Sequence, residues 1–258
     1  LWPKLVHPNI VFPRESWWDD ANGRCFVQME LCETDLLELV LKEGALEDER
    51  GSVFAGHLAS ALVHLHSQGI AHQDVKLENI FVSREGVAKL GDVGSVVEIR
   101  PNTIQLEEED ETRGSNSISG NVNNSAAAEV RVDATLIASS TSSPFFVGSV
   151  MYAPPEGISS SRRSKRSSGK AKARRDPFAA DMWALGVSLW SALAGCHPWE
   201  LACVDRSKEF LEFVTKGAAA TIPQSFSPGL RSLLSRLLSL DPLQRPTAAE
   251  VLACPWVS

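Results

Sequence analysis

A lysine, an asparagine and a second aspartate follow Asp74 at offsets of two, five and eighteen residues, as Lys76, Asn79 and Asp92. An aspartate can accept a proton from a hydroxyl group, and a lysine can neutralise charge on a moving phosphoryl group. Asparagine and aspartate also supply the hard oxygen ligands that magnesium prefers. Because phosphoryl transfer depends mainly on positioning and charge neutralisation, these residues could perform it if the fold brought them together.

Short strands and loops are predicted around these four residues. Residues 80–82 and 87–90 are apolar runs on either side of Ser-Arg-Glu-Gly, which is typical of a hairpin-like turn. Upstream, residues 47–68 carry apolar side chains at steps of three and four, which predicts a helix that Gly69 ends. The two aspartates therefore fall on loops beside rigid elements, where catalytic groups are commonly presented.

Other segments with a clear period complete the expected framework. Residues 25–31 predict a strand, and residues 7–11 predict a turn that leads into one. Thr247 and Glu250 have the spacing of a helix-capping box. Further helices are expected over residues 35–40, 178–193, 208–214, 228–240 and 247–252.

The composition is that of a soluble globular chain of one large domain or two small lobes. The chain has 258 residues, of which 43% are hydrophobic and 22% charged. Its longest apolar runs are too short to span a bilayer, and no secretory signal pattern opens it. Five cysteines without Cys-x-x-Cys spacing indicate buried, reduced thiols, with neither a zinc site nor a disulfide framework. A cytoplasmic or nuclear location follows.

Two segments differ in composition from the rest of the chain. Residues 107–143 open with an acidic run and then contain mostly small polar residues, so we expect disorder there. Residues 159–175 hold eight basic residues and no acid, within a chain whose net charge is -7. This basic insert, also expected to be disordered, could be a nuclear-import signal, a docking surface for an acidic partner, or a solvated loop.

Three motifs, in order along the chain, carry a resemblance to a known family. They are His72-Gln73-Asp74 with Asn79, then Asp92-Val93-Gly94, then Pro154-Pro155-Glu156. The family pattern has H-R-D-L-x-x-x-N, D-F-G and A-P-E at these places, so the chain resembles a eukaryotic protein kinase. The resemblance implies an α+β, protein-kinase-like fold. Residues 1–31 would be a remnant of the small β lobe with the hinge strand, and residues 32–258 the mostly helical large lobe.

The resemblance also implies roles for the first four residues. Asp74 would orient and deprotonate the acceptor hydroxyl of a protein substrate, and Lys76 would neutralise charge on the transferred group. Asn79 and Asp92 would hold Mg²⁺ beside ATP. A lysine two positions after the catalytic aspartate is similar to the serine/threonine type of kinase. No nucleic-acid partner and no membrane segment are expected.

Supporting residues are implied in the same way. His72 would support the loop that carries Asp74, and Asp181 would hold that loop through hydrogen bonds to its backbone. Glu156 would pair with Arg245 in a structural ion pair.

Residues 25–32 resemble the hinge that binds adenine through backbone groups. Met29 would be the gatekeeper, Glu30 and Cys32 would make the hinge contacts, Asp35 would reach the ribose, and Phe81 would lie under the adenine.

Departures from the family pattern limit these expectations. Gln73 replaces the arginine that meets a phosphate on the activation loop, which predicts activity that does not depend on that phosphate. Val93 replaces a phenylalanine and should pack less fully. No glycine-rich loop or strand lysine is visible, and Lys4 lies too close to His7 to be that lysine. The expectation is a truncated kinase, with little activity unless an upstream segment is restored.

The resemblance extends to a subgroup. The hinge sequence, Gln73 and the Asn-Ile-Phe stretch at 79–81 are similar to the Wee/Myt kinases, although Leu77 stands where that group usually has proline. A cyclin-dependent kinase would then be the substrate. The alternative is a catalytically inactive pseudokinase that binds protein partners as a scaffold.

Overall fold

The structure, a computed structural model, describes residues 5–99, 149–158 and 176–257. The disorder predicted for residues 107–143 and 159–175 lies outside the described residues.

Two long helices form the centre of the molecule. Helices α2 (Asp48–Ser67) and α3 (Pro177–Ala194) pack against each other, and every residue of α3 from 179 to 193 is buried. Trp183 on α3 is fully buried. Both helices lie close to their predicted ranges, because their apolar positions recur at helical spacing. Gly69 follows α2 with φ of 72°, and its N–H donates to the carbonyl of His66.

Shorter helices surround this pair. They are α1 (Leu36–Glu43), α4 (Lys208–Lys216), α5 (Ala218–Thr221), α6 (Pro228–Leu237) and α7 (Ala248–Leu252). Helix α7 begins with the predicted capping box of Thr247 and Glu250. Helix α6 ends three residues before the predicted position, because the backbone turns at Leu238. The carbonyl of Ser239 then accepts a hydrogen bond from Arg245. Helix α5 was not predicted.

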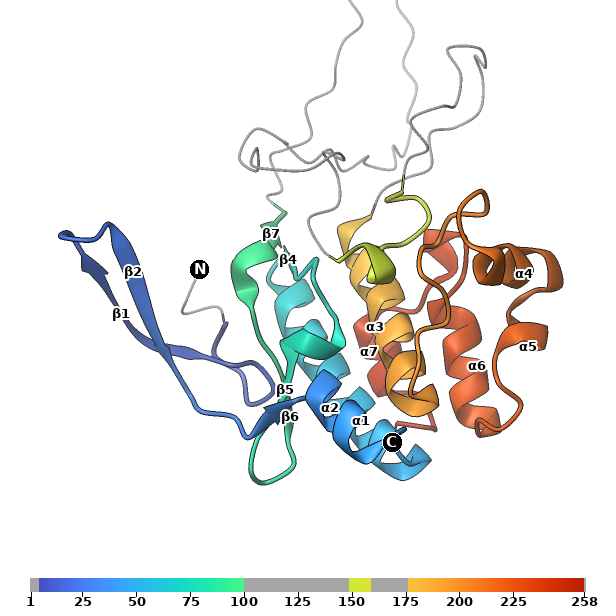
Figure 1. Cartoon of the computed structure of the whole chain (residues 1–258), viewed down its shortest axis with the longest axis horizontal. Helices are drawn as coiled ribbons and strands as arrows, with labels where there is room; N and C mark the ends of the chain where they lie inside the picture. Colours follow the sequence, from blue (N-terminus) through green and yellow to red (C-terminus); the bar gives the residue numbers. More distant parts are fainter. Residues whose placement is uncertain (1–4, 100–148, 159–175, 258) are drawn as a thin grey trace, which may run out of the picture.

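Small antiparallel sheets lie at the edge of the helices and carry the loops of interest. Strand β5 (Ile80–Val82) lies between β3 (Thr34–Asp35) and β6 (Ala88–Leu90). Strand β4 (Ile70–Ala71) pairs with β7 (Val97–Glu98). The β5–β6 pair is the predicted hairpin, and Figure 1 shows it beside α1 and α2. Single 3-10 turns lie at Leu77–Asn79, Val93–Ser95, Val150–Tyr152 and Pro242–Gln244.

A two-stranded hairpin projects away from the helices (Figure 1). Strand β1 (Pro13–Asp19) pairs with β2 (Arg24–Met29), the latter close to the predicted strand. Trp17 stacks on Phe26 with ring centroids 5.6 Å apart, but every residue of β2 is exposed. Only the base of β1, at Pro13, is buried.

One hydrophobic core joins the helices to the start of the chain. Leu5 and Ile10 belong to the same buried cluster as α2 and α3, although they precede the expected lobe boundary at residue 31. The five cysteines are free thiols, but the prediction that they are buried is wrong, because Cys25 and Cys196 are exposed and the others partly so. Within the described residues, no helix is long and apolar enough to cross a membrane.

Candidate active site

A buried carboxylate on α3 fixes the backbone of the loop that follows β4. The backbone N–H groups of His72 and Gln73 donate to the two carboxylate oxygens of Asp181, each at 2.7 Å. His66 at the end of α2 contacts the same carboxylate at 2.9 Å through Nε2. Asp181 is only 1% exposed, so each contact is shielded from water. The support expected from Asp181 is present, and His66 adds a contact that the sequence did not suggest.

Gln73 adopts a strained backbone conformation that this support maintains. Its φ is 66°, one of two positive values at residues other than glycine within the described ranges. Its side-chain Nε2 donates to the carbonyl of Pro177 at 2.8 Å, in the first turn of α3. The amide thus ties the loop to a helix, where the family pattern has an arginine that meets a phosphate.

The ring of His72 links this loop to the next one. The N–H of Asp74 donates to Nδ1 at 3.3 Å, and Nε2 lies 3.0 Å from the carbonyl of Gly91, which can only accept. The neutral tautomer with its proton on Nε2 satisfies both contacts. Burial lowers the pKa of His72, although Asp181 acts in the opposite direction. A neutral His72 therefore holds the loops at 72–74 and 91–92 together.

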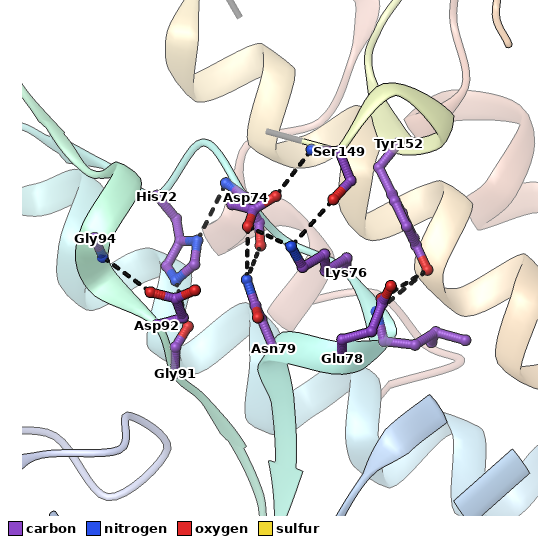
Figure 2. A network of polar contacts seen from close by, with 11 residues as sticks. His72, Asp74, Lys76, Glu78, Asn79, Gly91, Asp92, Gly94, Ser149 and Tyr152 are labelled. Carbon is purple, nitrogen blue, oxygen red and sulfur yellow. Dashed lines mark hydrogen bonds and ion pairs between the residues drawn. The ribbon is translucent and has the colours of Figure 1, made fainter. Parts of the chain in front are cut away.

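The Asp74 carboxylate is the centre of a polar network, drawn in Figure 2. Lys76 Nζ lies 2.6 Å from its Oδ2, and Asn79 Nδ2 lies 2.9 Å from the same oxygen. The N–H of Ser149 donates to Oδ1 at 3.0 Å, and the Ser149 hydroxyl accepts from Lys76 at 3.1 Å. Asp74 is 8% exposed, so its charge is shielded but still reaches the surface. The three donors fix the direction of this carboxylate.

Asn79 and Asp92 lie on loops that hydrogen bond directly to each other. The N–H of Gly91, beside Asp92, donates to the carbonyl of Asn79 at 2.8 Å. The side-chain bonds of Asn79 within the described residues use Nδ2, which leaves Oδ1 available as a ligand. Asp92 is exposed, has φ of 55°, and accepts a hydrogen bond from Gly94 at 3.3 Å.

Asn79 and Asp92 supply oxygen donors of the kind that magnesium prefers. Magnesium in such sites usually takes only one or two protein carboxylates and completes its shell with phosphate and water. No group of three or more His, Cys, Asp or Glu side chains able to hold a metal occurs in the parts of the chain that the structure describes.

The expected nucleotide residues are gathered around the β3–β5–β6 sheet, with one exception. Asp35 pairs with Phe81 across β3 and β5, and Phe81 pairs with Lys89 across β5 and β6. Lys89 forms an ion pair with Glu30 at 2.6 Å. The Phe81 ring lies so close to Gly91 that a Cβ there would be 2.6 Å from it.

The other expected nucleotide residues, Asp35, Cys32 and Met29, differ in their surroundings. Asp35 caps α1 by accepting from the N–H of Glu38 at 2.8 Å, a role that the sequence did not suggest. Cys32 is half-buried, and burial raises the pKa of its thiol, with the charge of Glu30 adding to the effect. Met29 is the exception, because it is 53% exposed at the end of the hairpin.

The predicted ion pair between Glu156 and Arg245 is present and buried. The two guanidinium nitrogens lie 2.6 and 2.8 Å from the two carboxylate oxygens. Arg245 also donates to the carbonyl of Ala179 at 3.0 Å and lies over the ring of Trp183. This pair joins the segment at 153–158 to the core and so places Ser149 near Asp74.

Two contributors to the network could not be found from spacing. Ser149 meets Asp74 across 75 positions of sequence. Tyr152 accepts from the N–H of Leu77 at 3.4 Å and donates to Glu78 at 3.3 Å. Burial and the charge of Glu78 raise the pKa of Tyr152 far above its ordinary value. Both residues belong to the stretch 148–156, which ends in the Pro-Pro-Glu motif and resembles the segment of the family that docks the acceptor residue.

The arrangement has the elements needed for phosphoryl transfer to a hydroxyl group. An oriented carboxylate can accept the proton of the attacking hydroxyl, and a lysine beside it can neutralise charge. Two oxygen donors nearby suit a metal that carries phosphates.

Comparison with known proteins agrees with this chemistry. A family model described as "Protein kinase domain" matches residues 1–115 and 133–257. The chain is 27% identical over 96% of its length to 3-phosphoinositide-dependent protein kinase 1 of Arabidopsis thaliana, covering 41% of that protein. It is 31% identical over 98% of its length to MAP kinase kinase kinase SSK2 of Saccharomyces cerevisiae, covering 15% of it. The human mitogen-activated protein kinase kinase kinase 4 is 27% identical over 96% of the chain, which covers 12% of that protein.

The chain thus spans less than half the length of each of these relatives. The family match itself covers most of the chain. The chain belongs to the protein kinase family, of the eukaryotic type.

Proposed function

We propose that this chain transfers the γ-phosphoryl group of ATP to a serine or threonine hydroxyl of a protein. The observation that carries the proposal is the Asp74 carboxylate, held by Lys76, Asn79 and Ser149 at 2.6 to 3.0 Å. A carboxylate held in one direction at a partly open site suits a general base for a hydroxyl group.

Each residue of the network has a place in the proposed reaction. Asp74 orients the acceptor hydroxyl and takes its proton, while Lys76, already bonded to Asp74, neutralises charge on the transferred group. Asn79 Oδ1 and Asp92 would hold Mg²⁺, which supplies charge neutralisation on the phosphates when it is bound. Phe81 and the segment around Glu30 and Cys32 would receive the adenine.

Two observations support serine and threonine as acceptors. Lys76 lies two positions after Asp74 and contacts it, as in the serine/threonine type of loop. Several relatives carry names of serine/threonine kinases or of MAP kinase kinase kinases. Protein hydroxyl groups are therefore the substrate class to test first.

The test is transfer of labelled phosphate from ATP to a generic serine- and threonine-containing protein. It compares the unaltered chain, and any longer product that carries it, with the Asp74→Asn variant. We expect a fall of about 100-fold or more, because general-base assistance contributes roughly 10²–10⁴ in rate. The matched control is Asp205→Asn, at an exposed loop position, which should leave transfer unchanged. Equal transfer by Asp74→Asn and the unaltered protein would rule out the proposed base.

Nucleotide binding separates the enzyme from the scaffold alternative. A fluorescent ATP analogue titrated with and without Mg²⁺ should bind more tightly with the metal, and Asp92→Asn should remove that difference. If the chain and any longer protein that carries it bound the nucleotide in a metal-dependent way but transferred no phosphate, the non-catalytic, partner-binding function would be favoured instead.

A finer assignment to Wee/Myt-like kinases, with a cyclin-dependent kinase as substrate, has sequence support only. It depends on the hinge sequence and on Gln73, whereas the relatives named above carry other names. Phosphorylation of a purified cyclin-dependent kinase, at a rate at least tenfold above that of the generic substrate, would support it. Equal rates would count against it.

A further inference from the structure

A partly buried ion pair joins the segment that follows β2 to strand β6. Lys89 on β6 places its Nζ 2.6 Å from Oε2 of Glu30, the residue directly after the end of β2. The side chains of Lys89 and Glu30 are 16% and 24% exposed. By contrast, the pair of Lys216 with Glu212 has a separation of 3.5 Å, and both of its side chains are about half exposed. The Lys89–Glu30 pair is therefore shorter and better shielded from water and salt than an ordinary surface pair.

The segment 30–33, between β2 and β3, is held at both ends by the small sheet. At one end is the ion pair of Glu30, and at the other the N–H of Glu33 donates to the carbonyl of Val82 on β5 at 2.9 Å. Leu31 lies between these contacts and is 96% exposed, so its own side chain does not hold the segment. Figure 1 shows the chain running from β2 to the β5–β6 strands along this path. Lys89 thus holds the end of the segment that is nearer to the hairpin.

The same ion pair lies beside the residues proposed to receive adenine. Lys89 is the cross-strand partner of Phe81, and Phe81 is that of Asp35, so the three side chains share one face of the β3–β5–β6 sheet. Burial and the charge of Glu30 raise the pKa of the Cys32 thiol, whereas the charge of Lys89 lowers it. Both charges therefore lie near the segment that carries Cys32 as well as near the Phe81 face of the sheet.

Recognition of a base through backbone groups depends on how well those groups are fixed beforehand. A loose segment loses conformational entropy when it becomes ordered around a ligand, and this loss subtracts from the affinity. A shielded ion pair at Glu30 restricts the segment before any nucleotide arrives. Because the charge of Lys89 is already matched by Glu30, this role differs from direct binding of phosphate.

We propose that Lys89 is a positioning residue for nucleotide binding, which acts through Glu30 to fix the segment 30–33 in the conformation that receives adenine. The proposal rests on the proposed function, because it requires that this segment binds ATP. Lys76 and Asn79 hold Asp74 by separate contacts. Loss of the ion pair should therefore raise the KM for ATP and leave kcat nearly unchanged, as expected when binding is lost equally in the ground state and the transition state.

The first measurement needs no nucleotide. Amide hydrogen exchange, read by mass spectrometry of peptic peptides, compares the unaltered chain with Lys89→Met. We expect exchange over residues 30–33 to become faster by about tenfold or more, with exchange in α2 unchanged. Lys216→Met, which removes the lysine of the exposed pair, is the matched control and should leave residues 30–33 unaffected. Unchanged exchange at 30–33 in Lys89→Met would overturn the proposal and leave the proposed transfer untouched.

The second measurement is the affinity for the fluorescent ATP analogue in the presence of Mg²⁺. Lys89→Met and Glu30→Lys should each raise the Kd by about tenfold, because each removes the same interaction. The double variant Glu30→Lys, Lys89→Glu restores the pair with its charges exchanged and should bring the Kd back to within about threefold of the unaltered value. If Lys89→Met does not fold, the comparison of Glu30→Lys with the double variant gives the answer.

The outcomes separate this proposal from the proposed function. A double variant that binds no better than Glu30→Lys would overturn the positioning role, and so would a loss confined to kcat in a protein that transfers phosphate. If neither the unaltered chain nor any longer protein that carries it bound ATP, the proposed function itself would be contradicted, and this proposal with it.

Discussion

The loop around Asp74 and the β1–β2 hairpin are close in sequence but opposite in how they are supported. His72, Gln73, Asp74 and Asn79 are all buried, and hydrogen bonds join them to α3, to the loop at 91–92 and to Ser149. The hairpin exposes apolar side chains on both faces, including Trp18 at 61% and Met29 at 53%. Within the described residues, contacts with several elements thus hold the loop, whereas no element covers the hairpin.

This difference separates two parts of the proposed function. The residues for proton transfer and metal binding are positioned by the helical core, which the same chain provides. An isolated two-stranded hairpin is marginally stable in water, and three or more strands or a covering element are usually needed. The ordering of the hairpin should therefore respond to what binds it, while the loop should respond to mutations in the core.

The largest expected effect is on the loop, from Asp181→Ala. The substitution leaves the buried N–H groups of His72 and Gln73 without acceptors and removes the contact with His66. Each unsatisfied buried group costs about 1–3 kcal/mol, so we expect a loss of about 3–5 kcal/mol in the free energy of unfolding. Urea denaturation measures it, with the exposed Asp205→Ala as control. A loss below about 1 kcal/mol would show that the loop does not depend on this carboxylate.

A second prediction concerns the point where the β3–β5–β6 sheet meets the loop. A Cβ at position 91 would lie 2.6 Å from the Phe81 ring, so Gly91→Ala should destabilise the protein by about 1–3 kcal/mol. The added variant Phe81→Leu should recover part of that loss, because a smaller side chain makes room. If the losses of the two single variants simply added in the double variant, the contact with the Phe81 ring would not be the cause of the destabilisation. Thermal or urea unfolding of the three variants gives the answer.

Acidification from pH 7.5 to pH 5.5 should destabilise the loop around Asp74 and not the hairpin. Burial lowers the pKa of His72 below its ordinary 6.5, so the unfolded chain binds more protons than the folded one as pH falls. The contribution of the neutral His72 to the free energy of unfolding is then fully present above about pH 6.5 and decreases below it. Burial lowers the pKa of His7, His57 and His197 as well, with the same sign. The hairpin, residues 13–29, contains no histidine.

Unfolding in urea at pH 7.5 and pH 5.5 tests this dependence. The variant His72→Gln should be less stable at both values but should lose less on acidification. A pH dependence identical to that of the unaltered chain would show that another group is responsible.

The smallest effect is expected in the hairpin, from Trp18→Ala. Because Trp18 is 61% exposed, its removal should change the free energy of unfolding by less than about 0.5 kcal/mol. Trp183→Ala, at a fully buried position, should cost about 3–5 kcal/mol and serves as the reference. A loss at Trp18 that approaches that of Trp183 would mean that the hairpin is covered in solution.

Sequence reasoning was most successful where contacts are local or where a motif carries them. The helices at 48–67 and 177–194 followed from apolar spacing, and the β5–β6 hairpin from its turn. The four residues of the opening pattern lie on two loops that hydrogen bond to each other. The pair of Glu156 with Arg245 came from the family resemblance, since nothing in its local sequence requires it.

The remaining contacts depend on how distant segments pack. Ser149 reaches Asp74, and His66 reaches Asp181, only after α2 and α3 have come together. The capping role of Asp35 competes with its expected ribose contact, and spacing alone does not decide between them. The carbonyl of Ser239, just after the early end of α6, accepts a hydrogen bond from Arg245, a contact that no local propensity encodes.

The anchoring of residues 99 and 149 has a consequence for the geometry at Asp74. The N–H of Ile99 donates to the carbonyl of Gly69 at 2.7 Å, and the N–H of Ser149 donates to Asp74 at 3.0 Å. Residues 99 and 149 are thus both held by one short part of the fold, between Gly69 and Asp74. The position of Ser149 beside Asp74 is therefore set by contacts that the described residues make themselves.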